Sequence, residues 1–111
     1  MKKIFLISYL LLIVVSINAQ KVYSVNYKNQ ADITVYVVEY ENQADLKVYK
    51  VKYQNQVGKN DGKWFFTQNF TQAKKRIFFV NYPNQADLKI YFVKYENQAG
   101  WKNMSKKSLL Y

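Results

Sequence analysis

A unit of 13 residues recurs six times in this chain and constrains its fold more than any other feature. The consensus of the unit is Val/Ile-Tyr-x-Val-x-Tyr-x-Asn-Gln-Ala-Asp. Its first half is rich in β-branched and aromatic residues, which is typical of a strand, and its second half is polar, which is typical of a turn. The repeat predicts an all-β fold in which each unit supplies one short strand.

Alternation along each strand predicts which side chains are buried. One face reads Tyr-Val-Tyr in most units, whereas the opposite face starts with an apolar residue and then varies. We expect the Tyr-Val-Tyr face to form the core, with the second tyrosine of each unit in an equivalent, mostly buried structural position. These tyrosines are Tyr27, Tyr40, Tyr53, Tyr82 and Tyr95.

The fourth unit departs from the consensus. Successive units start 13 residues apart, but the gap before this unit is 16 because residues 58–62 form an inserted loop. Thr67 and Asn69 replace the central valine and second tyrosine, which predicts an irregular strand or a bulge. The alternative is a binding surface beside the loop. The aromatic residues that support it are Trp64, Phe65, Phe66 and Phe70.

Glutamine is common to all six predicted turns. Its side-chain amide offers two donors and one acceptor, so it can satisfy backbone groups that a tight turn leaves unpaired. We expect this structural role in preference to a ladder of ligand-binding amides. The residues are Gln30, Gln43, Gln56, Gln72, Gln85 and Gln98.

The first residues differ from the repeats. A short basic start, an apolar run and a small residue at Ala19 are typical of a secretory signal peptide. We expect residues 1–19 to be removed and residues 20–111 to form one domain, with an uncleaved anchor as the alternative. No cysteine follows the apolar run to carry a lipid. The predicted location is the periplasm, the cell surface or the extracellular space.

Composition argues against catalysis and against cofactors. The chain contains no histidine and no cysteine, so the usual zinc ligands and nucleophile pairs are lacking. Asp32, Asp45 and Asp87 occupy one equivalent turn position, whereas a catalytic acid pair needs two different environments. We therefore expect a turn-forming role for these acids and predict that the protein is not an enzyme and holds no cofactor or metal.

Positive charge is the main clue to a partner. Removing residues 1–19 takes away Lys2 and Lys3 and no acid, which lowers the net charge from +10 to +8. Such a surface attracts an anionic glycan or membrane, whereas the single arginine and the export signal disfavour nucleic acid. The alternative is that the lysines only keep the domain soluble. The candidate anion contacts are Lys47, Lys50, Lys52, Lys59 and Lys63.

The tandem Tyr-x-Val-x-Tyr-x-Asn-Gln-Ala-Asp units, the aromatic Trp64-Phe65-Phe66 after the insertion and the ending 99–110 together resemble the septoil-knot domain of secreted bacterial proteins. The function of that family is unknown, and the resemblance supplies no catalytic residues. It implies that the six units wind around one core along a chain path tied in a seven-crossing torus knot, a topology rare among folds.

Together these features predict an exported, non-catalytic structural or binding module that contacts anionic envelope or extracellular polymers. We expect a monomer. The alternative is a subunit of a self-assembling β fibre, because short repeats containing Asn and Gln can stack as a ladder. For the end of the chain we expect a helical turn between Ser105 and Tyr111, with Trp101 as an anchor.

Overall fold

The computed structural model describes residues 20–57 and 60–111, and its regular elements follow the repeat. Each unit contributes one strand and one turn, as the repeat predicted, and each turn takes the form of a 3-10 helix. The strands are β1 (Lys21–Ser24), β2 (Ile33–Val37), β3 (Leu46–Lys50), β4 (Lys63–Phe66), β5 (Lys75–Phe79) and β6 (Leu88–Phe92), followed by a short β7 (Gly100–Trp101). The turns are η2 (Lys28–Gln30), η3 (Glu41–Gln43), η4 (Gln54–Gln56), η5 (Phe70–Gln72), η6 (Pro83–Gln85) and η7 (Glu96–Gln98), and η8 (Met104–Leu110) ends the chain.

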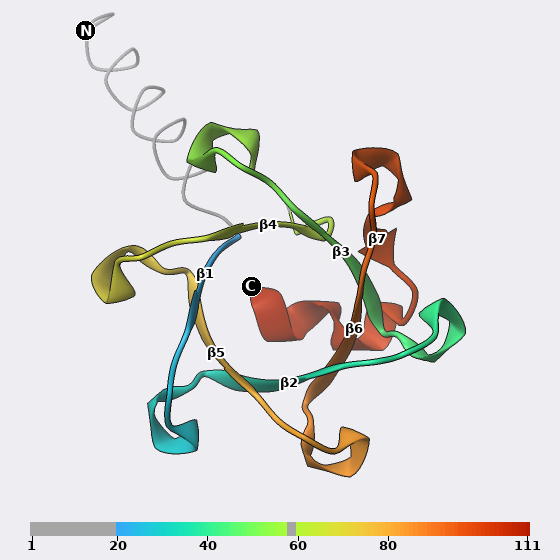
Figure 1. Cartoon of the computed structure of the whole chain (residues 1–111), viewed down its shortest axis with the longest axis horizontal. Helices are drawn as coiled ribbons and strands as arrows, with labels where there is room; N and C mark the ends of the chain where they lie inside the picture. The colour runs from blue at the N-terminus through green and yellow to red at the C-terminus, as the bar shows by residue number, and fades with distance from the viewer. Residues whose placement is uncertain (1–19, 58–59) are drawn as a thin grey trace, which may run out of the picture.

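The six repeat strands form a closed parallel barrel. Their order is β4-β1-β5-β2-β6-β3, and a further pairing of β3 with β4 closes the ring. β1, β2 and β3 therefore occupy alternate places in a first circuit, and β4, β5 and β6 fill the gaps in a second. The turns η2 to η7 point outward around the ring (Figure 1). We call them the rim turns. This winding confirms that the units surround a shared core and do not stack as an open solenoid.

One hydrogen bond recurs at each step around the ring. The backbone N–H of the fourth residue of a unit, usually the central valine, donates to the carbonyl of the first residue of the neighbouring unit. The partners are Val25 with Ile77, Val80 with Val35, Val38 with Ile90, Val93 with Val48, Val51 with Trp64, and Thr67 with Val22. The sixth bond, from Thr67 to Val22, returns to the first unit. The six units therefore form a closed ring in which each step uses the same hydrogen bond.

The aspartate that ends three of the turns joins neighbouring strands. Asp32 donates its backbone N–H to the carbonyl of Arg76 at 2.7 Å, and its carboxylate accepts from the Arg76 N–H at 2.8 Å. Asp87 makes the same two bonds with Thr34, and Asp45 makes them with Lys89. These acids thus do more than form the predicted turn. Each one also hydrogen-bonds the chain at its turn to a neighbouring strand of the barrel.

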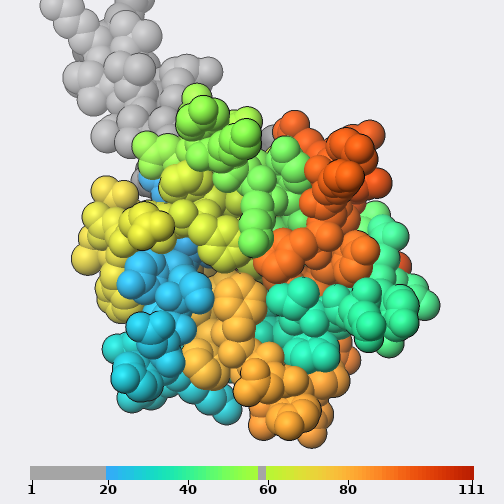
Figure 2. Space-filling model, in the orientation of Figure 1, coloured from blue at the N-terminus to red at the C-terminus, as the bar shows by residue number. Residues whose placement is uncertain are grey.

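The barrel interior is filled by the first apolar residue of every unit. These six residues are Val22, Val35, Val48, Trp64, Ile77 and Ile90, and each is at most 1% exposed. Leu46 and Leu88 lie in the same cluster and are fully buried. In the space-filling view, which has the orientation of Figure 1, segments from different units meet at the centre of the barrel with no opening between them (Figure 2).

The prediction that the second tyrosine of each unit is buried is wrong. Tyr27, Tyr40, Tyr53, Tyr82 and Tyr95 are 59% to 67% exposed. Each strand ends before this tyrosine, which instead precedes a rim turn, so the alternation of the strand does not extend to it. A six-stranded barrel also encloses little space, and aliphatic residues fill it more easily than rings that carry a hydroxyl.

The end of the chain closes the other side of the barrel. η8 lies within the ring in Figure 1, and its Leu110 is 1% exposed and belongs to the core cluster. The Nε2 of Gln20 donates to the Leu110 carbonyl at 3.3 Å, which brings the two ends of the described chain together. Trp101 packs against the core and donates from Nε1 to the Asn60 carbonyl at 3.0 Å. The expected terminal helical turn and the tryptophan anchor are both confirmed.

The fourth unit is more regular than expected. β4 pairs in parallel with both β1 and β3, so the predicted irregular strand or bulge is wrong. Asn69, which replaces the tyrosine, accepts a hydrogen bond from the Thr71 N–H at 3.0 Å and so begins its rim turn with a side-chain cap.

In the described part of the chain, no helix is long and apolar enough to cross a membrane.

Candidate functional site

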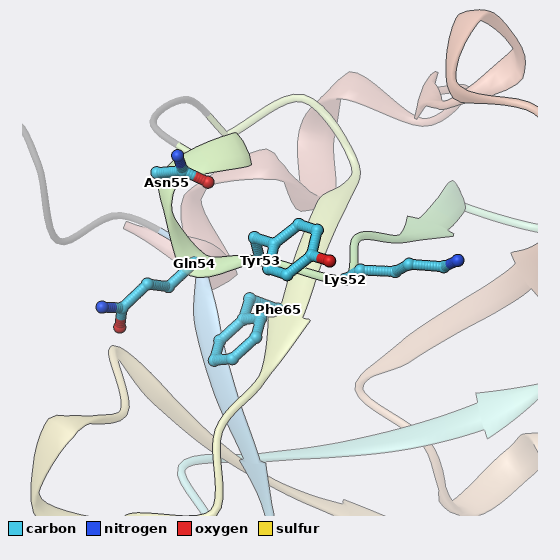
Figure 3. A pocket seen from close by; sticks show the side chains of 5 residues that line it. All are labelled: Lys52, Tyr53, Gln54, Asn55 and Phe65. Atoms are coloured by element: carbon cyan, nitrogen blue, oxygen red, sulfur yellow. The ribbon is translucent and has the colours of Figure 1, made fainter.

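An open pocket lies between the third rim turn and the neighbouring strand β4. Its volume is about 650 Å³, and its walls are Lys52, Tyr53, Gln54, Asn55 and Phe65. The rings of Tyr53 and Phe65 lie next to each other, with the Lys52 side chain extending to one side and the Gln54 and Asn55 amides on the other (Figure 3). The pocket therefore combines two aromatic surfaces with one ammonium group and two amides.

The backbone holds these side chains in place. Tyr53 precedes η4 in an extended conformation, with φ −125° and ψ 140°. The Oε1 of Gln56 accepts hydrogen bonds from the N–H groups of Lys52 and Tyr53 at 3.1 Å and 3.0 Å. On the opposite wall, Phe65 belongs to β4, and its N–H donates to the Gln20 carbonyl at 3.2 Å. Hydrogen bonds thus fix the backbone of both aromatic walls, at Tyr53 on one side of the pocket and at Phe65 on the other.

The candidate anion contacts do not gather into one site. Lys47 pairs with Glu41 at 3.4 Å, and Lys63 pairs with Asp61 at 3.5 Å and with Glu96 at 3.4 Å. Lys50 lies over the ring of Phe92, with 4.4 Å from its Nζ to the ring centroid. Lys52 lines the pocket, and Lys59 lies outside the described residues.

The ion pairs of Lys63 alter its titration. The charge of Asp61 and then the hydrogen bond with Glu96 raise the pKa of Lys63 above its usual value near 10.5. A raised pKa means that the folded state favours the charged ammonium, so this contribution to stability is present below pH 10.5 and is lost as the pH rises through the raised value. Lys63 is therefore held in internal pairs, whereas Lys52 faces the pocket.

The glutamines bond to the backbone in two ways. All six donate their backbone N–H to the carbonyl three residues earlier, at 3.0 Å to 3.2 Å, which closes the rim turns. In η4 and η7 the side chains of Gln56 and Gln98 also accept from the backbone N–H of the tyrosine before the turn. The expected pairing of backbone groups is therefore seen at these two side chains. All six glutamines are exposed.

Phe65 was named only for the alternative binding surface beside the loop and was not among the candidate contacts. It occupies the second position of its unit, where every unit carries tyrosine or phenylalanine, and the Tyr-Val-Tyr pattern placed this position in the core. In the structure all six of these residues are half-buried. The signal that could have found them was the presence of two aromatic residues per unit, which is more aromatic surface than a six-stranded barrel can enclose.

The pocket has the chemistry of a binding site. Among its five lining residues there is no acid and no nucleophile with a base beside it. An ammonium group and amides can bind oxyanions and hydroxyl groups, and exposed rings can pack against the apolar face of a ligand. This combination of groups suits a polar, anionic ligand that also has one flat apolar face.

Comparison with known proteins now places the chain in a family. The model of the 7(1) septoil knot domain matches residues 19–102. The chain therefore belongs to the septoil knot 7(1) domain family, as its repeats and its aromatic fourth unit predicted. No curated protein and no solved structure matches the chain.

Proposed function

We propose that this chain is an exported, non-catalytic binding module for acidic polysaccharides of the cell envelope or its surroundings. The observation that carries the proposal is the open pocket in which Tyr53 and Phe65 stand beside the ammonium group of Lys52. A sugar ring has an apolar face that packs on aromatic side chains, and a uronate carboxylate or a sulfate attracts the lysine. Amides such as those of Gln54 and Asn55 bind sugar hydroxyl groups.

The charge of the domain supports an acidic ligand. Residues 20–111 carry a net charge of +8, which attracts anions over a distance of roughly 8 to 10 Å at moderate salt. Lys47 and Lys63 are held in ion pairs, so the pocket lysine is better placed to meet an added anion.

Export is supported by the leader pattern of residues 1–19. The family match begins at residue 19, next to the expected cleavage point after Ala19. Amino-terminal sequencing of the protein recovered outside the cytoplasm would test this directly, and Gln20 is the expected first residue. A protein that keeps Met1 to Ala19 would contradict removal of the leader.

Binding is tested with residues 20–111 and alginate, a polymer of uronic acids, with neutral dextran as the control polymer. We expect retention on alginate that weakens as salt rises from low to physiological, because the attraction is electrostatic. Lys52→Gln should weaken it several-fold. Lys102→Gln is the matched control, since it removes the same charge from an exposed lysine outside the pocket. Equal retention on dextran, or no retention on either polymer, would contradict the proposal.

The fibre alternative receives less support. Each of the six repeat strands is hydrogen-bonded to two others in the closed ring, which leaves little free edge for adding further chains. A stable monomer in sizing experiments would argue against the fibre, and seeding of thioflavin fluorescence would argue for it.

We also propose that the path of the chain is the seven-crossing torus knot of the family. The two interleaved circuits support this topology, and Gln20 and Leu110 lie close enough for the ends to be joined. Residues 20–111 would be cyclised head to tail in the folded state and then denatured. A trapped knot should give a smaller hydrodynamic radius than the same chain cyclised while unfolded. Equal radii would contradict the knot.

A further inference from the structure

We infer that the pocket beside Tyr53 has an adjacent counterpart around Tyr95, and that the two sites form a track for consecutive sugars of one acidic polysaccharide chain. This inference rests on the proposed function and extends it from one site to two. It follows from the equivalence of the repeats, from the placement of lysines on them and from a local hydrogen bond that distinguishes two of the six units.

The hydrogen bonds around the ring place equivalent aromatic pairs together. In the third unit, Val51 donates to the Trp64 carbonyl. Tyr53 lies two residues after the donor, and Phe65 lies directly after the acceptor. These two residues are the aromatic walls of the pocket. In the sixth unit, Val93 donates to the Val48 carbonyl. The same step places the following pair at the equivalent position: Tyr95 and Tyr49.

The two tyrosines share their conformation and exposure. Tyr53 has φ −125° and ψ 140°, and Tyr95 has φ −123° and ψ 144°. Tyr53 is 66% exposed and Tyr95 is 59% exposed, and their partners Phe65 and Tyr49 are both half-buried. A large ring that stays in water at the same place in two units is available to a ligand.

The turns below these tyrosines are also alike. Gln56 accepts from the N–H of Tyr53 at 3.0 Å, and Gln98 accepts from the N–H of Tyr95 at 3.2 Å. Among the described residues, no other rim-turn glutamine makes this side-chain bond. The third and sixth units therefore form a matched pair within the ring.

The charge just before the exposed tyrosine selects the same two units, and the acid just after the second tyrosine, Glu96, is paired with Lys63. The residue before the exposed tyrosine is Lys52 in the third unit and Lys94 in the sixth, and both lysines are exposed. Elsewhere this position is neutral, except that Glu39 precedes Tyr40. A carboxylate at the Tyr40 position repels an acidic sugar, so that unit offers a natural contrast.

The paired sites are neighbours in space. Tyr49 belongs to β3, which pairs with β6 on one side and with β4 on the other. The Tyr95 site spans β6 and β3, and the Tyr53 site spans β3 and β4, so both use β3. Lys63 of β4 reaches Glu96 at the start of η7, which confirms how near the two regions are. A polymer held at one site therefore meets the next without crossing the barrel.

The test uses alginate and a short alginate oligosaccharide with single and double variants. We expect Tyr53→Ala and Tyr95→Ala each to weaken polymer binding by roughly tenfold, and the double variant to lose more than either, because linked sites act together. Tyr40→Ala is the matched control, with the same side chain removed beside Glu39, and should bind as wild type. For the short oligosaccharide, we expect shifts in the amide NMR signals of both η4 and η7.

The outcomes separate this inference from the proposed function. If Tyr95→Ala and Lys94→Gln bind alginate as tightly as wild type while Tyr53→Ala fails, the second site is wrong and the first stands. If Tyr40→Ala weakens binding as much as Tyr95→Ala, the lysine-selected track is wrong. If the unaltered domain binds no alginate at any salt concentration, the proposed function fails as well. Because the tyrosines are exposed, the variants are expected to fold, and their NMR spectra provide the check.

Discussion

Asp45 and Lys89 hold two neighbouring strands together through a pair of hydrogen bonds. The Asp45 N–H donates to the Lys89 carbonyl at 2.8 Å, and the Asp45 carboxylate accepts from the Lys89 N–H at 2.9 Å. The other carboxylate oxygen of Asp45 accepts from the side chain of Asn103 at 3.2 Å, and its carbonyl accepts from the N–H groups of Lys102 and Asn103. One residue thus joins β3, β6 and the segment that leads into η8.

Replacing Asp45 should therefore destabilise the fold. We expect Asp45→Ala to lower the free energy of unfolding by about 2 to 3 kcal/mol, because it leaves donors on Lys89 and Asn103 without their charged acceptor. Asp32→Ala is the control, since Asp32 bonds to Arg76 in the same way but is exposed and has no link to the end of the chain. Its expected cost is about 1 kcal/mol. Denaturant unfolding measures both, and equal costs would show that the link to Asn103 adds nothing.

Gly62 should not tolerate a side chain. It has a φ of +92°, and an added Cβ would collide with the carbonyl oxygen of Lys47. We expect Gly62→Ala to cost about 2 to 4 kcal/mol from backbone strain and overpacking together. Gly100→Ala separates the two effects, because Gly100 also has a positive φ of +152° but open space around it. Its expected cost is about 1 kcal/mol. Similar melting of the two variants would remove the collision from the explanation.

Leu110 should contribute as much as a residue of the barrel itself. It is fully buried within the core cluster, although it is the second-last residue of the chain. We expect Leu110→Ala to cost about 2 to 5 kcal/mol, as for other buried leucines. Met104→Ala, at an exposed position of the same helix, should change stability by no more than about 0.5 kcal/mol. Thermal melting of both variants tests this, and an unchanged Leu110→Ala would mean that η8 is dispensable to the fold.

The glutamines should differ among themselves. We expect Gln56→Ala to cost about 1 kcal/mol, because its side chain accepts from two backbone N–H groups at the start of η4. Gln43→Ala should change stability by less than about 0.5 kcal/mol, because Gln43 is exposed and no side-chain bond of it is seen in residues 20–57 or 60–111. Equal unfolding free energies for the two variants would show that the extra bonds are not stabilising.

The local structure could be read from the sequence, because each unit carries its own strand and turn signals. The strands begin directly after Asp32, Asp45 and Asp87, where the consensus changes from polar to apolar. The neighbours of each strand could not be read in this way, because all units present nearly the same residues to a partner. Only the resemblance to a family indicated the winding, since strand order depends on the path of the whole chain.

The candidate site was predicted in part. Lys52 was among the expected anion contacts and lines the pocket, but charge alone could not separate it from Lys47 and Lys63, whose ion pairs depend on the fold. Tyr53 was placed inside because alternation identifies two faces without saying which one is enclosed. The interior volume of the barrel settles that choice, and it depends on the number of strands.

The two interleaved circuits have a consequence for how such a domain can change during evolution. An open array of repeats can gain or lose a unit at its end and leave the other contacts intact. In this barrel β1 lies between β4 and β5, so a duplicated unit would give strands new partners and widen an interior that is already filled. We therefore expect the repeat number to be inherited as a whole, with variation concentrated in the rim turns and in the loop before β4.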